Sequence, residues 1–409
     1  MIDHQVHTLS NGIRILLKQS ESPVTHCCFI VNTGSRDEQD GKDGLAHFIE
    51  HLLFKETEKR NTGQILNRLE LVGADLNAYT TKEYTCIHAS LLGQYLERTA
   101  DLFADILFHS TFPEEELEKE RSVILDEIAS YLDQPEEAIQ DDFEELLFKN
   151  HPLGRNILGT PETVSQLNRP DILQFLSANY NTSDMVFGVF GAHSLPKVVK
   201  LAEKYFGGIP ANHTTKHRSP PPANKTKFLS LGKPISQLHC VIGNQAYPNA
   251  HPHKYALLLL NNVLGGMGMS NRLNMEIREK HGIAYTIESN YVPLSDTGIF
   301  SIYFGTDAEK AEKASKLVHR ELRKLREQKL GVVQLHQAKQ KFTGQIALAE
   351  ENRMGLIISL AKSLLDFGHI DTLEQVIGKI NSVTAEELIG ISNEIFDNSL
   401  VTLIFEPKQ

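Results

Sequence analysis

Residues 46–54, with the sequence AHFIEHLLF, place two histidines four positions apart and a glutamate between them. On an α-helix, positions i, i+3 and i+4 share one face, so His47, Glu50 and His51 project from the same side. The apolar residues between them supply the surface on which such a helix is buried. Buried imidazoles and carboxylates are costly unless they have partners, and a zinc ion is one such partner. The pattern therefore favours a metal-binding helix; the alternative is a helix whose polar edge arose by chance.

A second predicted helix, which begins at Pro113, is rich in glutamate. Proline at the start and acidic residues in the first turn are typical of a helix N-terminus. Glu120 and Glu127 lie seven residues apart, which is two turns along one face. From composition alone, these are solvated acids on a charged helix.

The length and charge of the chain limit its class. With 409 residues, the chain is long enough for two domains with separate cores. Its formal net charge of −11 argues against a general nucleic-acid or anionic-membrane partner, because no block of Lys and Arg dominates. The same charge is compatible with basic peptides. No apolar run approaches the roughly 20 residues that span a bilayer.

The N-terminus and the cysteines bear on the cellular compartment. The first residues, MIDHQVH, have neither the basic and apolar regions of a signal peptide nor the Arg-rich composition of a transit peptide, so we expect a cytoplasmic protein. The four cysteines include no C-x-x-C pair. We therefore expect buried strand cysteines, with neither a disulfide framework nor a thiolate zinc site.

Local patterns predict several elements of the first half. Residues 7–19 predict a hairpin around a Ser-Asn-Gly turn. Residues 75–91 mix Thr, Tyr and Ile with period 2, which predicts two strands joined at Lys82-Glu83. A helical region is expected from Pro113 to about residue 149, and in the second half another helix is expected over residues 271–281.

Residues 209–227 form the clearest boundary in the chain. This segment contains the triple proline 220–222 among polar residues, a composition that favours an extended linker. It separates two halves of similar length, 1–208 and 228–409.

The two halves look like a diverged repeat. The helix over Glu114–Ile128 has a counterpart in Val332–Ile346. Four positions differ together: Leu257, Leu260, Asn261 and Gln345 stand in the second half where the first half has His47, Glu50, His51 and Glu127. The second half thus keeps the helices and lacks the polar set, which favours chemistry in the first half.

These features resemble a known family. The H-x-x-E-H motif, the acidic helix, the duplicated half and the run REKHGIAY at 278–285 are similar to the pitrilysin/insulinase (M16) zinc metallopeptidases, especially their processing-peptidase-like bacterial subfamily. The resemblance covers essentially the whole chain. It implies an α+β fold of the LuxS/MPP-like metallohydrolase type. Each half, 1–208 and 228–409, is then a homologous domain made of a mostly antiparallel β-sheet with helices packed on one face.

The resemblance also implies roles for residues of the first half. His47, His51 and Glu127 are expected to bind one Zn²⁺ per chain, and Glu50 to act as the general base. Glu120 is expected to orient a ligand histidine through its second ring nitrogen. Three protein ligands leave a fourth zinc position open for water.

Four further residues are expected, from the same resemblance, to contact the substrate. Asn77 and Ala78 fall on the strand that pairs with the substrate backbone in the family. Arg278 and Tyr285 match the family's Arg-x6-Tyr pair, which reaches the substrate from the second half. Tyr285 can donate a hydrogen bond to the oxyanion, and Arg278 can supply positive charge.

The expected activity is that of a zinc endopeptidase or oligopeptidase acting on unfolded or short peptides. A homodimer is expected, a heterodimer with a paired subunit stays open, and no nucleic-acid partner, membrane partner or organic cofactor is expected. The alternative is a non-catalytic peptide-binding or core subunit of a processing-peptidase-like heterodimer. Relatives of that kind typically lose the zinc residues, which this chain keeps.

Overall fold

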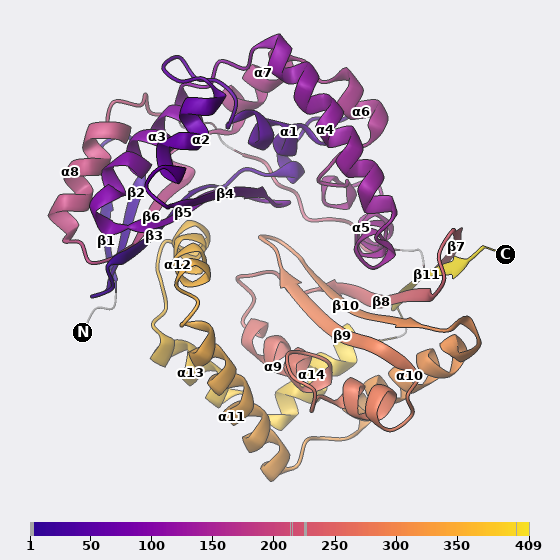
Figure 1. The fold of residues 1–409 in the computed structure, drawn as a ribbon. Helices are drawn as coiled ribbons and strands as arrows, with labels where there is room; N and C mark the ends of the chain where they lie inside the picture. Colours follow the sequence, from indigo (N-terminus) through magenta and orange to yellow (C-terminus); the bar gives the residue numbers. More distant parts are fainter. Residues whose placement is uncertain (1–3, 213, 215, 225–226, 398, 409) are drawn as a thin grey trace. The chain divides into compact units, whose positions relative to one another are not determined.

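The structure is a computed structural model that describes residues 4–212, 214, 216–224, 227–397 and 399–408. Its chain forms two compact units, drawn as a ribbon in Figure 1. The units are built from the described residues of these segments: 1–129, 155–217 and 349–370 for the first, and 130–154, 218–348 and 371–409 for the second.

A six-stranded sheet forms the centre of the first unit. Its order is β1-β2-β6-β3-β5-β4, and only β2 and β6 pair in parallel. The central strands β3 and β6 are nearly continuous apolar runs because both of their faces are buried. β4 lies at one edge of the sheet. The bounds are β1 (Gln5–Thr8), β2 (Arg14–Gln19), β3 (Val24–Val31), β4 (Asp75–Thr80), β5 (Thr85–Leu92) and β6 (Met185–Gly191).

Most helices of the first unit pack on one face of this sheet. Inward side chains such as Phe29 and Phe187 form one core cluster with the apolar faces of the helices. The helices are α1 (Leu45–Leu52), α2 (Thr62–Glu70), α3 (Leu96–Phe108), α4 (Glu114–Leu132), α6 (Pro161–Gln166), α7 (Arg169–Asn179) and α8 (Leu195–Phe206). The opposite face carries α12 (Arg353–Phe367), in which Ile357 and Leu364 belong to one core cluster with Cys28.

The second unit repeats this plan. Its sheet has the order β7-β11-β8-β10-β9, with β7 and β11 parallel, and this order matches that of the first sheet without β1. One face carries the cluster formed with α9, η5, α10 and α14, and the other face packs on α5.

The bounds of the strands are β7 (Phe228–Lys233), β8 (Leu238–Ala246), β9 (Ala284–Pro293), β10 (Gly298–Thr306) and β11 (Val401–Pro407). The helices are α5 (Pro135–Leu147), α9 (Lys254–Leu264), the π-helix η5 (Asn274–Glu279), α10 (Ala311–Glu327), α11 (Val332–Ala349), α13 (Leu373–Ser382) and α14 (Ala385–Ile395). Short 3₁₀ turns complete the chain: η1 (Ser35–Asp37), η2 (Gly93–Tyr95), η3 (Pro152–Gly154), η4 (Thr182–Asp184) and η6 (Ala308–Lys310).

α5, which follows α4 in the sequence, belongs to the second unit, and α12, which follows α11, belongs to the first. α5 comes from the first half of the sequence and packs on β8 and β11, whereas α12 comes from the second half and packs on β3 and β6. The predicted halves are contiguous in sequence, whereas the two compact units are not. One boundary between units, at residues 217 and 218, falls within the predicted linker; residues 213, 215, 225 and 226 of that linker lie outside the described residues.

The expected fold class, two α+β halves with mostly antiparallel sheets, is confirmed. The helix on the second face of each sheet was not expected. The hairpin over residues 7–19 is present as the β1–β2 pair. The helical region expected up to about residue 149 is two helices, because Pro135 starts a new one. The helix expected over 271–281 contains the π-helix η5.

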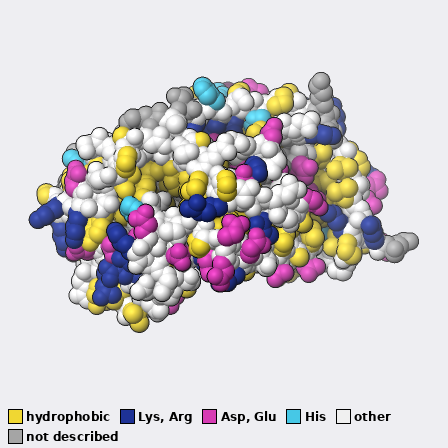
Figure 2. Space-filling view, turned by 90° about the horizontal axis from the view of Figure 1, so that it is seen from above, with side chains coloured by type: hydrophobic (Ala, Val, Ile, Leu, Met, Phe, Trp, Pro, Cys, Tyr) yellow, Lys and Arg dark blue, Asp and Glu magenta, His cyan; other side chains and the backbone are white. Residues whose placement is uncertain are grey.

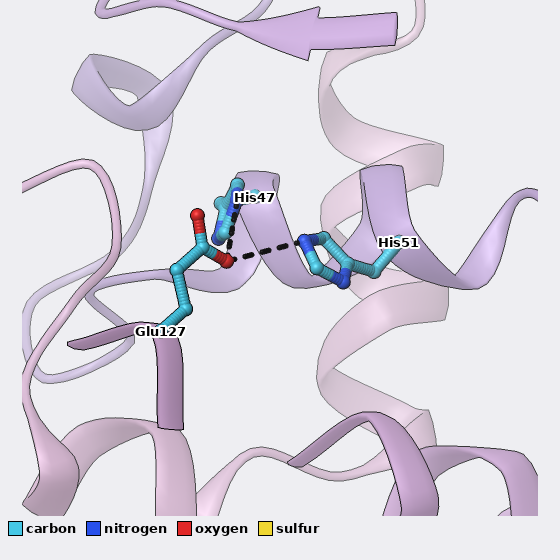
Figure 3. Close-up of side chains that lie close together, drawn as sticks. All are labelled: His47, His51 and Glu127. Carbon is cyan, nitrogen blue, oxygen red and sulfur yellow. Dashed lines mark ion pairs between the residues drawn. The ribbon is translucent and has the colours of Figure 1, made fainter. Parts of the chain in front are cut away.

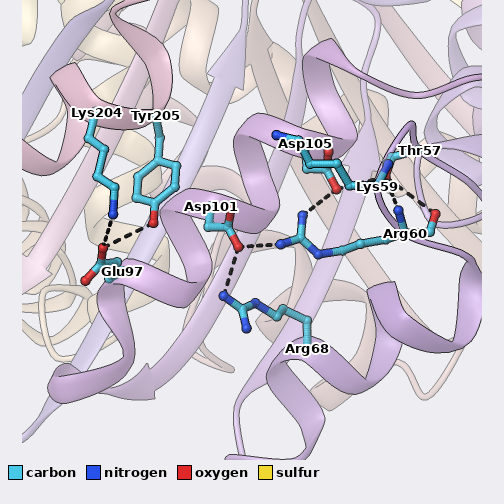
Figure 4. A network of polar contacts seen from close by, with 9 residues as sticks. All are labelled: Thr57, Lys59, Arg60, Arg68, Glu97, Asp101, Asp105, Lys204 and Tyr205. Carbon is cyan, nitrogen blue, oxygen red and sulfur yellow. Dashed lines mark hydrogen bonds and ion pairs between the residues drawn. The ribbon is translucent and has the colours of Figure 1, made fainter.

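A polar network fixes the segment after α1 to α3 (Figure 4). Arg60 pairs with Asp101 at 2.5 Å and also with Asp105. Arg68 of α2 pairs with the same Asp101 at 2.8 Å. Because Asp105 is almost fully buried and charge-paired, this network holds the end of the α1 segment against the core.

The surface is mixed in charge on the face shown in Figure 2, where Lys and Arg side chains are interspersed with Asp and Glu. Neither sign of charge covers this face continuously. No helix among the described residues is both long and apolar enough to cross a bilayer.

Candidate metal centre

α1 carries both histidines of the candidate centre. Phe48 is fully buried in the core of the first unit, which fixes the helix. The start of the helix is held by Glu38, whose carboxylate accepts hydrogen bonds from the amides of Gly44 (3.2 Å) and Ala46 (2.8 Å). Gly44 has a φ of +93°, and a Cβ there would lie 2.6 Å from a neighbouring carbonyl oxygen. Only glycine fits this position.

α4 supplies two glutamates to the same place. Glu120 is buried and Glu127 is half-buried, two turns apart on one face of the helix. Glu127 Oε2 lies 3.5 Å from His51 Nε2 and 3.8 Å from His47 Nε2 (Figure 3). One ligand atom from each of these three residues lies within 4.8 Å of the others. The structure thus brings together the three predicted ligands.

These separations suit a bound ion. Distances of 3.5 and 3.8 Å are too long for good hydrogen bonds. A tetrahedral zinc ion with ligand bonds of about 2.1 Å holds neighbouring ligand atoms roughly 3.4 Å apart. Two imidazole nitrogens and one carboxylate oxygen are also a donor set that zinc accepts in catalytic sites. The residues present therefore fit zinc.

Glu120 orients the ring of His51. Nδ1 of His51 donates to Glu120 Oε2 at 3.0 Å, so Nε2 presents its lone pair toward Glu127. The other oxygen of Glu120 pairs with Lys55 Nζ at 2.6 Å. Burial acts to lower the pKa of His51, but the hydrogen bond and charge of Glu120, with the charges of Glu127 and Glu50, raise it above its ordinary value.

Glu120 itself is held as an anion. Burial acts to raise the pKa of Glu120, but the hydrogen bonds and charges of His51 and Lys55 outweigh burial and lower it. A charged carboxylate is the better acceptor for the Nδ1 proton. The predicted orienting role therefore has a matching geometry.

His47 is held differently. Burial, and then the charge of His51, lower the pKa of His47 to about 3, so its imidazole is neutral, which is the form that binds metals. Its Nδ1 is buried and has no hydrogen-bond partner among the described residues. The ring of His47 is therefore oriented by packing, and its centroid lies 4.6 Å from that of His51.

Glu50 stands beside the ligands on α1. Burial raises the pKa of Glu50 above its ordinary value, although a hydrogen bond from Thr80 opposes the shift. That bond runs from Thr80 Oγ1, at the end of β4, to Glu50 Oε2 at 2.7 Å. A half-buried carboxyl with a raised pKa is suited to take up and return a proton.

The predicted peptide-contacting residues lie in two places. Asn77 and Ala78 are on the edge strand β4, where Asn77 is exposed and its Oδ1 accepts a hydrogen bond from the Ala78 amide at 2.8 Å. Arg278 and Tyr285 are in the second unit, beside one another, with the guanidinium 5.4 Å from the tyrosine ring centroid. The Tyr285 side chain is 83% exposed.

Comparisons with known proteins decide the family. A family profile described as Insulinase (Peptidase family M16) matches residues 14–161, and one described as Peptidase M16 inactive domain matches residues 166–342. A protein of Bacillus subtilis named an uncharacterized zinc protease is 32% identical over 403 residues, which cover 98% of each chain. The chain belongs to the insulinase family of peptidases, M16.

Other M16 relatives span the same length. A protein of Mycobacterium leprae, also named an uncharacterized zinc protease, is 31% identical over 98% of this chain and 91% of its own. The crystal structure of a protease from Helicobacter pylori has the same fold, with a TM-score of 0.90 and 24% identity over 99% of both chains. The names of the Bacillus and Mycobacterium relatives describe zinc proteases.

The second half of the M16 chain shows what replaces the metal set. Nδ2 of Asn262 donates to Gln345 Oε1 at 2.7 Å, between α9 and α11. Gln345 is the residue that the sequence repeat sets opposite Glu127, and Asn262 follows Asn261, which the repeat sets opposite His51. Gln345 Nε2 donates to the carbonyl oxygen of Met267 at 2.9 Å, and the buried Oδ1 of Asn262 has no hydrogen-bond partner among the described residues.

Sequence reasoning missed two residues of the site, Lys55 and Thr80. Lys55 follows His51 by four residues, but it lies in the turn after the end of α1 at Leu52, so helical spacing does not place it. Thr80 lies two residues after Ala78, but its contact with Glu50 depends on how α1 packs against β4, which no local pattern shows.

Proposed function

We propose that this chain is a zinc-dependent endopeptidase or oligopeptidase that hydrolyses unfolded or short peptides. The observation that carries the proposal is the convergence of His47, His51 and Glu127, with Glu50 beside them on α1. The neutral imidazole of His47 is buried, the charged Glu120 orients the ring of His51, and Glu127 adds a carboxylate oxygen. This is the arrangement of a set of metal ligands rather than of a charged surface. One zinc ion per chain is part of this proposal.

The protein side chains have separate tasks in the proposed reaction. A zinc ion bound by His47, His51 and Glu127 would supply Lewis acidity toward water and the scissile carbonyl. Glu50 takes the proton of the attacking water and passes it to the departing amine. Glu120 keeps His51 in the tautomer that presents Nε2.

The edge strand β4 supports the choice of an extended peptide as substrate. An extended chain can add to a free strand edge by main-chain hydrogen bonds, which select weakly among side chains. The Ala78 amide donates a hydrogen bond to Asn77 Oδ1. A peptide that pairs with this amide therefore replaces a side-chain acceptor, and no backbone hydrogen bond of the protein has to break there. For the exposed Tyr285 and its neighbour Arg278 we propose contact with the peptide, as hydrogen-bond donor and positive charge.

The alternative is a binding subunit without catalysis, paired with an active partner. The intact set of His47, His51, Glu127 and Glu50 argues against it, because a binding subunit has no need of a general base. We propose a homodimer as the assembly, which the mass of the purified protein in solution tests.

The first prediction concerns the general base. In Glu50→Gln, we expect zinc to bind with unchanged stoichiometry while kcat for a quenched fluorescent peptide falls by roughly 10²- to 10⁴-fold, because the proton acceptor is lost. Metal analysis and initial rates on the same preparation measure both. Equal turnover by the two proteins would remove Glu50 as the base, and a wild-type protein that binds no zinc would favour the binding-subunit alternative.

A further inference from the structure

The side chain of Glu50 has one hydrogen-bond partner residue among the described residues, Thr80. Thr80 Oγ1 donates to Glu50 Oε2 at 2.7 Å. The Thr80 backbone amide also bonds the Glu50 carboxyl group, so Thr80 contacts it through both its hydroxyl and its backbone. The contact joins the helix of the metal centre to the last residue of the edge strand β4.

The strand end that carries Thr80 is firmly anchored. The carbonyl oxygens of Thr81 and Lys82 accept hydrogen bonds from the amides of Ser35 (3.1 Å) and Arg36 (2.8 Å). A Cβ at Gly34 would lie 2.2 Å from the Thr81 carbonyl oxygen, so the two loops approach as closely as backbones can. The residue after Thr80 therefore cannot shift without breaking these contacts.

A buried ion pair strengthens the same anchor. Arg36 Nη1 lies 2.7 Å from Glu83 Oε1, and the two side chains are 1% and 5% exposed. Such a pair is costly to separate, because each buried charge would lose an oppositely charged neighbour. The Glu50 end of the bond is fixed as well, since the amides at the start of α1 bind the carboxylate of Glu38. Both ends of the contact are thus preorganised.

We infer that Thr80 is a positioning residue for Glu50: its hydroxyl, which donates to Oε2, sets the direction of the carboxylate during peptide hydrolysis. The inference rests on the proposed peptidase function and goes beyond it. In the reaction, the water oxygen adds to the scissile carbonyl carbon as its proton moves to the Glu50 carboxylate, and this proton passes to the amine nitrogen as the C–N bond breaks. Thr80 keeps its own proton throughout and neither gains nor loses charge.

The hydroxyl matters because it restrains the rotation of the Glu50 carboxylate, in addition to the restraint from the Thr80 backbone amide. A displacement of about 1 Å in a catalytic group can cost on the order of 10²-fold in rate. Thr80 is also on the strand that carries Asn77 and Ala78. The same rigid element therefore sets both the proposed peptide edge and the direction of the base.

The test compares Thr80→Val, which keeps the shape and removes the hydroxyl, with Thr80→Ser, which keeps the hydroxyl. Zinc content, melting temperature, KM and kcat are measured for the full chain on one quenched fluorescent peptide. We expect Thr80→Val to bind zinc normally and to lose roughly 10- to 100-fold in kcat, with KM within about two-fold of wild type. Thr80→Ser restores kcat to within about three-fold.

A double-substitution cycle gives a readout that a merely structural role would not move. In the Glu50→Gln background, Thr80→Val should leave the residual rate unchanged, because there is no base left to position. An additive loss in that background, or a loss of kcat that follows loss of zinc or of folded protein, overturns the positioning role.

The outcomes also distinguish failure of this inference from failure of the proposed peptidase function. A wild type that cleaves the peptide together with an equally active Thr80→Val overturns the role of Thr80 alone. A wild type that binds zinc and cleaves no peptide overturns the proposed function, and this inference with it.

Discussion

At the scale of single residues, the two histidines of α1 differ in what their second nitrogen touches. His51 is held by Glu120, which is held in turn by Lys55, whereas the Nδ1 of His47 is buried without a hydrogen-bond partner among the described residues. The motif spacing was enough to predict that the rings share a face. It could not predict this asymmetry, which depends on the packing of α4 against α1.

The asymmetry predicts the effect of removing the charge of Glu120. Glu120→Gln keeps an acceptor for Nδ1 of His51 but loses the anion, so we expect zinc affinity to fall by about 10- to 100-fold. Competition with a chelator of known affinity measures the change. The matched control is Glu115→Gln on the same helix, an exposed glutamate paired only with Lys119 among the described residues, which should bind zinc as wild type does. Unchanged affinity in Glu120→Gln would contradict the orienting role.

At the scale of elements, the sequence predicts the two strands of the β4–β5 hairpin, but it does not predict the contacts that anchor this hairpin. The alternation of Thr, Tyr and Ile over residues 75–91 indicated two strands with a turn at Lys82-Glu83, and the structure has β4 and β5 on either side of that turn. The anchor at Gly34 and Arg36 lies about 45 residues earlier in the chain, so no local pattern connects it to the turn. Nothing in the sequence distinguishes the buried pair of Arg36 and Glu83 from two charges on the surface.

The anchor predicts a coupled effect on stability. Arg36→Met or Glu83→Leu alone removes one member of the buried ion pair, and we expect each to lower the free energy of unfolding of the first unit by roughly 3–5 kcal/mol. The double substitution should cost clearly less than the sum of the two. Denaturant unfolding of all four proteins measures the cycle. Single changes that simply add in the double variant would show that the pair is not coupled.

At the scale of the whole molecule, the sequence repeat predicted the shared plan of the two sheets but not the exchange of α5 and α12. Hydrophobic periodicity shows that each helix has an apolar face, and it does not show which sheet that face covers. Both sheets offer a second apolar face, which α12 covers in the first unit and α5 covers in the second. The proline-rich segment marks one crossing between units, and the chain makes others, at residues 129/130 and 348/349 among them.

The exchange predicts that neither half folds well alone. A fragment of residues 1–217 lacks α12, so the sheet face with Cys28 and Phe190 loses its cover of Ile357 and Leu364, each worth about 1.5–3 kcal/mol when buried. Such exposed apolar faces favour aggregation. We expect fragments 1–217 and 218–409 to be poorly soluble when expressed singly and to form a soluble one-to-one complex when expressed together. The matched control appends residues 349–370 to the first fragment through a flexible linker, which should raise its solubility by restoring α12. Soluble, cooperatively unfolding single fragments without that segment would show that α12 is dispensable for the first sheet.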